Sequence, residues 1–359
     1  MNKVSRRKFL KTILVGSAAI ITDQLAISCA SQAPQGGVTQ VNKPDKASPT
    51  VPLQAENPTQ AVFPTTGATN PSEAPIIMPT EEAIAIPSET PMSFPDLVVA
   101  RNAEPEDLVR RAISGLGGMG RFVKSGANVI IKPNICVDYH SYEYAATTNP
   151  WVVGALVKLC FEAGAGSVRV MDSPFGGSAE SAYAISGIAD QVNAAGGEMV
   201  IMQDFKFIQT DIPQGIDLKS TQLYDDILNA DVLINVPVAK NHGLARLTLG
   251  MKNLLGVIYD RPNMHRDLGQ RLPDLASRVY PTLTVVDAVR IMTTNGPTGG
   301  SLDFVQKRDT IIASADIVAA DSYGATLFGL QPLDLSYVRK GTAMGLGRSD
   351  LQAMNILEI

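Results

Sequence analysis

The sequence has few of the residues that several classes of protein depend on. Its 359 residues include three cysteines and no Cys-x-x-Cys pair, so the chain is neither a disulfide scaffold nor equipped to hold an iron–sulfur cluster. It also lacks a Gly-x-Gly-x-x-Gly sequence after a strand and a phosphate-binding loop, which argues against classical NAD or nucleoside triphosphate binding. The three histidines are far apart, so a metal site would need residues from distant segments.

Positive charge and long apolar runs are scarce as well. The net charge is −5 and no basic stripe occurs after the first eleven residues, so we expect no nucleic-acid partner. No apolar run of about 18 residues follows the N-terminal segment, which excludes a polytopic membrane protein. What remains is an N-terminal signal, a proline-rich tether and one folded unit.

Residues 1–29 resemble a targeting signal. Arg6 and Arg7 precede Phe-Leu-Lys and the apolar run 13–21, a pattern typical of twin-arginine export signals. The signal ends in Leu-Ala-Ile-Ser-Cys29, which resembles a lipobox in which the cysteine is lipidated. We therefore expect the twin-arginine export machinery as a partner, an extracytoplasmic location, and membrane attachment only through the lipid on Cys29. A general secretory signal, cleavage after an Ala-x-Ala-like site, and an uncleaved anchor are the alternatives.

Residues 30–95 hold twelve of the 23 prolines and repeat Thr, Ser, Ala and Gln without a helical or strand period. Such a segment buries too little apolar surface to offset the entropy of ordering it. We predict a disordered tether here, which leaves residues 96–359 as the folded domain. Because the charges of the signal and the tether cancel, the net charge of −5 belongs to this domain.

The domain alternates between β-branched apolar runs and helical segments of ten or more residues. This alternation predicts an α/β fold with a mostly parallel sheet covered by helices. Strands are expected at 97–100, 128–132, 168–171, 198–202, 230–235, 283–286 and 310–313. Helices are expected at 104–115, 150–161, 179–194, 265–279 and 315–328. Residues 127–131 and 230–234 are similar to each other, which fits either two related lobes or a chance match of two strands.

Polar residues follow several of the expected strands, where open α/β sheets bind ligands. Lys132-Pro-Asn134 follows the second strand, Asp172-Ser-Pro follows the third, and Lys240 lies in the polar cluster after the fifth. Asp287 follows the sixth strand in the same way. A buried lysine without a partner is costly. Lys132 and Lys240 therefore predict either an anionic ligand or a carboxylate partner such as Asp172.

The segment from His242 to Lys252 carries the sharpest chemical signal. A helix is expected to begin between these two residues, and a helix start offers backbone N–H groups to an anion. His242 can act as an acid or base, or as a metal ligand together with the distant His265. The two cysteines of the domain are less informative. Cys136 is close to the polar cluster, Cys160 lies in an apolar helix, and nothing in the sequence supports a disulfide between them.

Six short motifs occur in a fixed order along the domain. They are Ile-Lys132-Pro-Asn, Thr147-Thr-Asn-Pro, Val-Met-Asp172-Ser, Asn235-Val-Pro-Val-Ala-Lys-Asn-His, Met-Lys252-Asn-Leu-Leu-Gly and Asn295-Gly-Pro. In this order they resemble the domain-of-unknown-function family 362. The resemblance implies an α/β fold and, in some members, an attached ferredoxin-type iron–sulfur module, which this chain lacks. It implies little about the reaction, because the activity of the family is not established.

The spacing of His242 and Lys252 also resembles part of the lactate racemase family, whose cofactor is a nickel pincer. In that family the lysine corresponding to Lys252 carries the cofactor, and the histidine works at the metal or the substrate. This sequence departs from the family pattern, because Leu249-Gly-Met-Lys stands in place of Gly-Gly-x-Lys. His265 is a candidate for a further catalytic histidine without matching the pattern. The resemblance therefore implies that a bound metal is one option, and the cofactor stays unknown.

These observations combine in one functional hypothesis. We predict an exported, lipid-anchored enzyme that acts on a small anionic substrate in a cleft lined by Lys, His and Asp. The alternatives are a non-catalytic ligand-binding lipoprotein, a metal-dependent racemase-like enzyme, and a structural protein whose polar clusters are only turns and caps. The predicted catalytic residues are Lys132, Asp172, Lys240, His242 and Lys252. The predicted ligand-binding residues are Asn134, Asn241, Asn253, Asn295 and Gly296, and the predicted metal ligands are His242 and His265.

Overall fold

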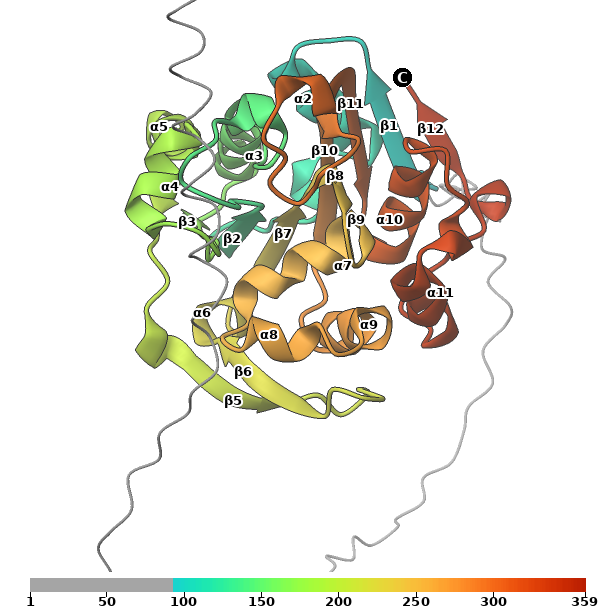
Figure 1. Cartoon of the computed structure of the whole chain (residues 1–359). Helices are drawn as coiled ribbons and strands as arrows, with labels where there is room; N and C mark the ends of the chain where they lie inside the picture. The colour runs from blue at the N-terminus through green and yellow to red at the C-terminus, as the bar shows by residue number, and fades with distance from the viewer. Residues whose placement is uncertain (1–92) are drawn as a thin grey trace, which may run out of the picture. The chain divides into compact units, whose positions relative to one another are not determined.

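A mixed ten-stranded sheet crosses the protein, and its central strands are parallel (Figure 1). The computed structural model describes residues 93–359, so the predicted signal, the tether and Cys29 lie outside the described residues. The order of the strands across the sheet is β12 (Ile356–Glu358), β1 (Leu97–Arg101), β11 (Val305–Ser314), β10 (Leu283–Met292), β7 (Val232–Val236), β2 (Asn128–Pro133), β3 (Ser167–Val170) and β4 (Glu198–Met199). From β10 to β4 all neighbours pair in parallel, whereas β11 pairs antiparallel with β1 and β10. The predicted α/β fold is confirmed.

Two smaller hairpins extend this framework. The strands β8 (Val238–His242) and β9 (Arg246–Thr248) form an antiparallel pair that joins the sheet through β10. The strands β5 (Phe207–Asp211) and β6 (Ser220–Tyr224) form a separate two-stranded sheet, seen at the bottom of Figure 1. Within residues 93–359, no helix is both long and apolar enough to cross a membrane.

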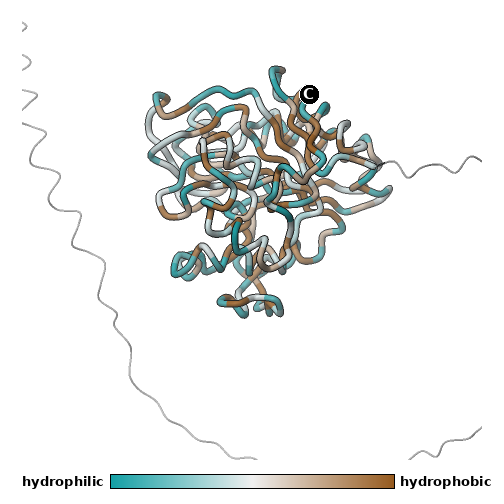
Figure 2. Tube along the Cα trace, turned by 90° about the vertical axis from the view of Figure 1, so that its right-hand side faces the viewer, coloured by the Kyte–Doolittle hydropathy of each residue, from teal (hydrophilic) through white to brown (hydrophobic). Residues whose placement is uncertain are grey.

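Successive residues of the central strands enter two different hydrophobic cores, one on each face of the sheet. On β2, Val129 and Ile131 belong to one core and Ile130 belongs to the other, as the alternation of side chains along a strand requires. One core is covered by α2 (Pro105–Gly115), α3 (Pro150–Glu162), α4 (Ala179–Ile185) and α5 (Ile188–Ala194). The other is covered by α7 (Gly250–Asn253), α9 (Leu268–Arg278), α10 (Ile317–Thr326) and α11 (Ser336–Ala343). Figure 2 shows apolar segments running through the interior of the folded part, as this layered arrangement requires.

The predicted helix at 179–194 is wrong in one respect, because the structure divides it into α4 and α5. Ser186 and Gly187 separate the two helices, and Gly187 has a φ of +73°, a left-handed conformation that glycine adopts without steric cost. The Ser186 hydroxyl donates to the carbonyl of Tyr183 and accepts from the N–H of Ile188, which replaces helical hydrogen bonds at the break. The start of α3 is as predicted, with Asn149 accepting from the N–H of Trp151.

The predicted strand 283–286 is longer in the structure, and Asp287 does not lie at its end. β10 continues to Met292, and Asp287 is a buried residue in its middle, where it accepts hydrogen bonds from the N–H groups of Asn149 and Val289. Burial raises the pKa of Asp287 to about 6. This residue therefore connects the sheet to the start of α3 and takes no part in the ligand site.

The two similar segments predicted to be strands pair with each other. β2 and β7 are parallel neighbours, and their registers place Val129 opposite Val232 and Ile131 opposite Ile234. All described residues belong to one compact unit. The internal similarity therefore marks adjacent strands of one sheet, and the alternative of two lobes is wrong.

The buried carboxylate of Asp321 fixes the start of α7, the short helix that carries Lys252. Its two oxygens accept from the N–H groups of Gly250 and Met251. Each buried donor left unsatisfied costs about 1–3 kcal/mol, so Asp321→Ala should lower the free energy of unfolding by about 2–5 kcal/mol in chemical denaturation. The matched control is Ser322→Ala, because the buried Ser322 hydroxyl has no partner within residues 93–359. Equal losses in the two variants would contradict this role.

Candidate functional site

A cavity of about 890 Å³ opens beyond the carboxyl ends of β2 and β3. This is the position at which open α/β sheets bind ligands, since the loops that follow parallel strands meet at one edge. Segments far apart in the sequence contribute to it, from the loop after β2 to the turn at Gly296. The structure brings eight predicted residues to its wall, namely Asn134, Asp172, Lys240, His242, Lys252, Asn253, His265 and Gly296.

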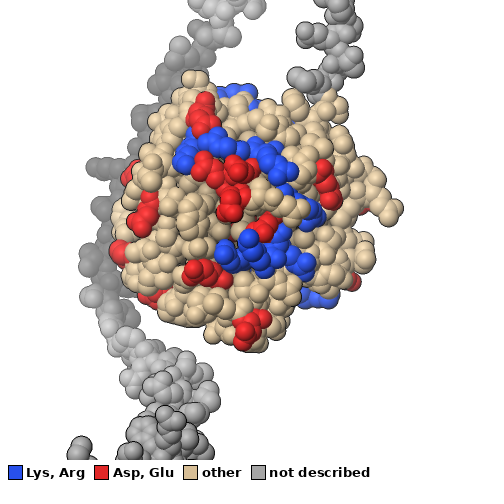
Figure 3. Space-filling model, turned by 90° about the horizontal axis from the view of Figure 1, so that it is seen from above, with Lys and Arg blue, Asp and Glu red and all other residues tan. Residues whose placement is uncertain are grey.

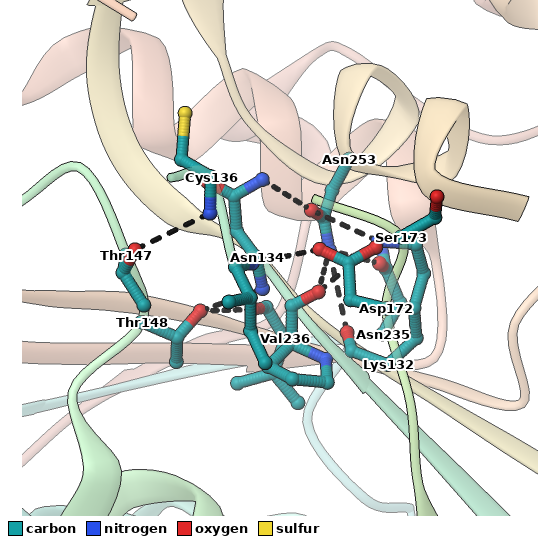
Figure 4. A network of polar contacts seen from close by, with 12 residues as sticks. Lys132, Asn134, Cys136, Thr147, Thr148, Asp172, Ser173, Asn235, Val236 and Asn253 are labelled. Carbon is teal, nitrogen blue, oxygen red and sulfur yellow. Dashed lines mark hydrogen bonds and ion pairs between the residues drawn. The ribbon is translucent and has the colours of Figure 1, made fainter. Parts of the chain in front are cut away.

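Lys132 lies behind the wall of the cavity, where it forms a buried ion pair with Asp172 (Figure 4). The Lys132 Nζ lies 2.7 Å from Asp172 Oδ1 and also donates to the carbonyl of Pro133. The second oxygen of Asp172 accepts from the N–H of Ile135 at 2.7 Å. Burial lowers the pKa of Lys132, and the Asp172 carboxylate opposes that shift. Lys132 is thus the cation that neutralises Asp172. It was predicted to lie in the ligand site, but it does not line the cavity.

Asn253 connects the short helix α7 to the two central strands. Its Nδ2 donates to Asn235 Oδ1 at 2.9 Å, and its Oδ1 accepts from Asn134 Nδ2 at 2.9 Å and from Lys132 Nζ at 3.3 Å. Asn134 Oδ1 is buried and has no hydrogen-bond partner within the described residues. An unsatisfied buried amide oxygen at the wall of a cavity is available to a ligand.

Glycine at position 256 allows α7 and the segment after it to approach the ion pair. A β-carbon on Gly256 would lie 1.9 Å from Asp172 Oδ1 and 2.6 Å from Lys132 Nζ. Both distances are shorter than any real contact, so a side chain here would displace the pair. The Leu-Leu-Gly part of the predicted motif therefore reflects close packing against the charged centre of the site.

The β8–β9 hairpin delivers Lys240 and Thr248 to the cavity from opposite positions. The two residues are paired in register, and both are buried. Lys240 Nζ donates to the carbonyl of Ala146 at 2.5 Å, and burial lowers the pKa of this lysine. Thr248 Oγ1 is buried without a partner in the described part of the chain. A helix does begin between His242 and Lys252, as expected, but only at Gly250, where α7 starts. The residues before it form the β8–β9 hairpin.

The hydrogen bonds of His242 determine its protonation. Its Nδ1 accepts from the N–H groups of Leu244 and Ala245, both at 3.1 Å. A nitrogen that accepts two backbone bonds carries no proton, so the neutral ring is protonated at Nε2. Burial, Lys252 and Lys240 lower the pKa of His242 to about 3, which keeps the ring neutral at physiological pH. His242 is therefore a hydrogen-bond donor at the cavity wall.

Lys252 and Arg261 complete the cationic lining. Burial and the nearby Lys240 lower the pKa of Lys252 to about 8. Arg261 was not predicted from the sequence. It opens α8 (Arg261–Met264), donates through Nη2 to the carbonyl of Ser173 at 2.5 Å, and has its pKa lowered by burial. Only its position shortly after the Leu-Leu-Gly motif could have indicated Arg261, since no expected strand ends there.

Two predicted ligand-binding residues, Asn241 and Asn295, lie outside the lining. Asn241 Oδ1 accepts from the N–H of Gly296 at 3.1 Å, and Asn295 has a φ of +56° in the turn that precedes Gly296. These residues shape the turn that brings Gly296 and Pro297 to the cavity. Their role in the structure is to position that turn.

The two cysteines of the domain are both buried free thiols. Cys136 lies at the cavity wall, 3.8 Å from the carbonyl of Pro297, and its side chain faces Lys240. Cys160 lies in α3, where burial raises its pKa to about 12. The conceivable disulfide between them is absent from this structure.

The described residues do not fit the predicted metal site. The hydrogen bonds of His242 direct a protonated Nε2 into the cavity, where a metal ligand needs a lone pair. His265 is exposed, with its Nδ1 3.0 Å from the carbonyl of Arg261. Within residues 93–359, no group of three or more His, Cys, Asp or Glu side chains is arranged to hold a metal ion. We therefore assign no metal to His242 and His265.

Cations outnumber carboxylates at the cavity wall. Lys240, Lys252 and Arg261 line it together with Asp172 and Asp204. Asp172 is already paired with Lys132, and Asp204 is exposed. On the outer face seen in Figure 3, by contrast, basic and acidic side chains are intermingled. The surplus of positive charge at the cavity wall favours an anionic ligand.

The sequence profile of the domain of unknown function DUF362 matches residues 129–326, from β2 to the end of α10. The chain belongs to the DUF362 family. Lys132, Asp172, Lys240, His242 and Lys252 all lie within the matched region of this DUF362 domain. The family predicted from the order of the six motifs is thereby confirmed.

Two further comparisons relate the DUF362 chain to known proteins. It is 29% identical over 247 residues to the thylakoid-associated protein sll1697 of Synechocystis sp., covering 66% of this chain and 74% of that protein. It is similar to the solved structure of the lactate racemase apoprotein from Thermoanaerobacterium thermosaccharolyticum, with 14% identity and a TM-score of 0.38. That similarity covers 59% of this chain and 53% of the racemase, so the chain spans about half the length of that structure.

The Lys132–Asp172 pair should behave as a buried ion pair in a double-mutant cycle. Asp172→Leu leaves the Lys132 ammonium buried without its carboxylate, which should lower the free energy of unfolding by about 3–5 kcal/mol. The double variant Lys132→Met/Asp172→Leu should lose less than Asp172→Leu alone. The exposed pair Arg110–Glu162 is the control, and Glu162→Leu should cost less than about 1 kcal/mol. Additive losses for Lys132 and Asp172 would show that the two residues act independently.

Proposed function

We propose that this protein is an exported, lipid-anchored enzyme that binds a small organic anion in the cationic cavity and transfers a proton to or from it. The observation that carries the proposal is the surplus of positive charge at the cavity wall, from the buried Lys240 and the half-buried Lys252 and Arg261. Buried cations without carboxylate partners are unfavourable in the free protein. An anion that enters the cavity relieves that cost, so the affinity depends mainly on the negative charge of the ligand.

Each lining residue has a role that follows from its environment. Lys240 and Arg261 are fixed by bonds to backbone carbonyls and supply positive charge at defined positions. His242 offers its Nε2–H to an oxygen of the ligand, because its Nδ1 is engaged by the hairpin turn. Lys132 and Asp172 are positioning residues, since their pair holds the loop that carries Asn134. This assignment revises the predicted catalytic role of both.

Lys252 is the residue best suited to exchange a proton with the substrate. Its pKa of about 8 means that both the ammonium and the amine are populated near neutral pH, as general acid–base catalysis requires. The positive charges around it would stabilise the negative charge that forms when a proton leaves carbon next to a carboxylate. The substrate class we propose is therefore a small carboxylate with an acidic C–H group.

Anion binding should depend on the charge of Lys252. Lys252→Met should weaken the binding of butyrate and inorganic phosphate about 10–100-fold in isothermal titration calorimetry, the loss expected for a charge-assisted hydrogen bond. The wild-type affinity should fall as the pH rises above about 8, because the ammonium form that attracts the anion is lost, and Lys252→Met should lack this step. The control is Lys340→Met, which removes a half-buried lysine paired with Asp267 and absent from the cavity lining. Wild-type affinity and pH dependence in Lys252→Met would overturn the assignment.

A second measurement separates an enzyme from a ligand-binding protein. An enzyme of the proposed kind exchanges the α-proton of a bound α-hydroxy carboxylate with D2O, which NMR detects. Binding without exchange across such a panel would leave the non-catalytic ligand-binding lipoprotein as the better description. Exchange that is lost in Lys252→Met and kept in Lys340→Met would support the enzyme.

Export through the twin-arginine machinery and attachment through Cys29 belong to the same proposal. The basis is the Arg6-Arg7 signal followed by a lipobox-like sequence. The relative from Synechocystis sp. is called thylakoid-associated, and an association with a membrane is compatible with a lipid anchor. The proposal places the cavity outside the cytoplasm and attaches the chain to the membrane only through its lipid.

Two variants of the N-terminal segment should separate export from anchoring. In a bacterial host with a twin-arginine pathway, Arg6→Lys/Arg7→Lys should leave the full chain in the cytoplasm. Cys29→Ala should be exported but should lose labelling by radioactive palmitate and appear in the soluble fraction. Palmitate labelling that persists in Cys29→Ala would contradict the assignment of the lipidated residue.

A further inference from the structure

The cavity has a buried cation at its base, and large apolar side chains are among the exposed residues that line it, together with Asp204 and His265. Lys240 and Thr248, at its base, are 1% and 3% exposed. Phe175, Leu244 and Tyr259 also line the cavity, yet they are 58%, 70% and 52% exposed. From the base of the cavity outward, the lining therefore changes from a buried cation to exposed apolar side chains.

Both ends of this gradient are unfavourable in the free protein. Burying an ammonium without a carboxylate costs several kcal/mol in desolvation. Exposed large apolar side chains that surround one opening mark a binding surface, because isolated exposed residues are common whereas a rim of them is not. A ligand with an anionic end and an apolar end would relieve both costs at once.

The apolar part of the lining is continuous along one wall. The ring of Phe207 packs against that of Tyr259 with 5.3 Å between centroids, and Met202 and Ile258 line the same cavity. Leu223 of β6 bridges to Ile258, so the β5–β6 hairpin supports this wall. These apolar residues line the same cavity as Lys240 and Leu244, so a hydrocarbon chain bound there has apolar side chains to pack against.

The volume of the cavity points in the same direction. About 890 Å³ lies near the upper end of the range in which pockets hold drug-sized ligands, far larger than an anion of a few atoms requires. Thr248 Oγ1 and Asn134 Oδ1, both buried without partners in the described residues, lie where the anionic end would be. Only the base of the cavity offers polar groups of this kind.

We propose that the ligand is an anionic amphiphile, a carboxylate or phosphate joined to a hydrocarbon chain. The anion contacts Lys240, Lys252 and Arg261, and the chain lies along Phe207 and Tyr259 toward Phe175 and Leu244 at the mouth. This inference rests on the proposed function for the anionic end of the ligand, and it extends the ligand from a small anion to one that also carries a hydrocarbon chain. It adds a requirement for the apolar end that anion binding alone does not make.

The test is a chain-length series measured by isothermal titration calorimetry with the full chain. Butyrate, octanoate and dodecanoate are used below their critical micelle concentrations, and dodecyltrimethylammonium controls for the charge. Affinity should rise with length, by at most about fourfold for each methylene group, and dodecanoate should bind at least about tenfold more tightly than butyrate. The ammonium amphiphile should not compete with dodecanoate, because the base of the cavity is cationic.

Variants at the mouth test the path of the hydrocarbon chain. Phe175→Ser and Leu244→Ser should each lower the ratio of dodecanoate to butyrate affinity about threefold or more. Leu244→Ser keeps the backbone N–H that donates to His242 Nδ1, so the His242 ring keeps this hydrogen bond. The matched control is Ile216→Ser, at a residue that is 60% exposed and does not line the cavity.

The outcomes distinguish this inference from the proposed function. Equal affinity for butyrate and dodecanoate would overturn the amphiphile and leave anion binding intact. No binding of any alkanoate or of phosphate would overturn the proposed function itself. Serine variants that change only the oligomeric state in light scattering would identify the mouth as a protein interface, and the amphiphile would fall.

One further arm identifies the source of the ligand. Cys29→Ala protein, which lacks the anchor residue, is incubated with phosphatidylglycerol vesicles and with phosphatidylcholine vesicles. Recovery of phosphatidylglycerol with the separated protein would assign a membrane lipid. Binding of dodecanoate without extraction from either vesicle would assign a soluble amphiphile.

Discussion

The ion pair between Lys132 and Asp172 is the constraint around which the cavity is built. The two charges are buried at the ends of neighbouring parallel strands. Each charge therefore needs the other, and the remaining N–H groups and lone pairs need hydrogen-bond partners. Asp172 then fixes the N–H of Ile135, Lys132 bonds to Asn253, and Gly256 is needed to let the following segment pass. Three segments are thereby held together by an ion pair that lies behind the cavity wall.

The positive charges of Lys240, Lys252 and Arg261 lower the stability of the fold, because they are partly or fully removed from water. Lys240, Lys252 and Arg261 all have their pKa values lowered by burial, which means that the ionised forms are held at a disadvantage. Structures tolerate such local conflicts at functional sites and compensate for them elsewhere. Here the compensation comes from two well-packed cores on either side of the sheet. The same burial lowers the pKa of Lys252 to about 8, so both of its protonation states are populated near neutral pH.

The class of the fold and the edge of the sheet at which the cavity lies could be predicted from the sequence. β-branched runs and the polar residues after them located Lys132, Asn134 and Asp172, since both signals depend on local sequence. The β8–β9 hairpin, the position of Lys132 behind the wall and the contribution of Arg261 depend on tertiary contacts instead. Lys132 and Asp172 are 40 residues apart, so only the strand pairing determines that they meet. The protonation of His242 likewise follows from two backbone bonds that no residue pattern encodes.

The cavity is assembled from segments that are distant in the chain, from Asn134 to Pro297. No fragment of the chain contains it, so a ligand binds the native state and has no affinity for the unfolded one. Such a ligand stabilises the fold by mass action, by about 2.7 kcal/mol when its concentration is a hundred times its dissociation constant. Occupancy of the cavity and survival of the folded chain are therefore thermodynamically linked. A shortage of such a ligand would therefore reduce the amount of folded protein.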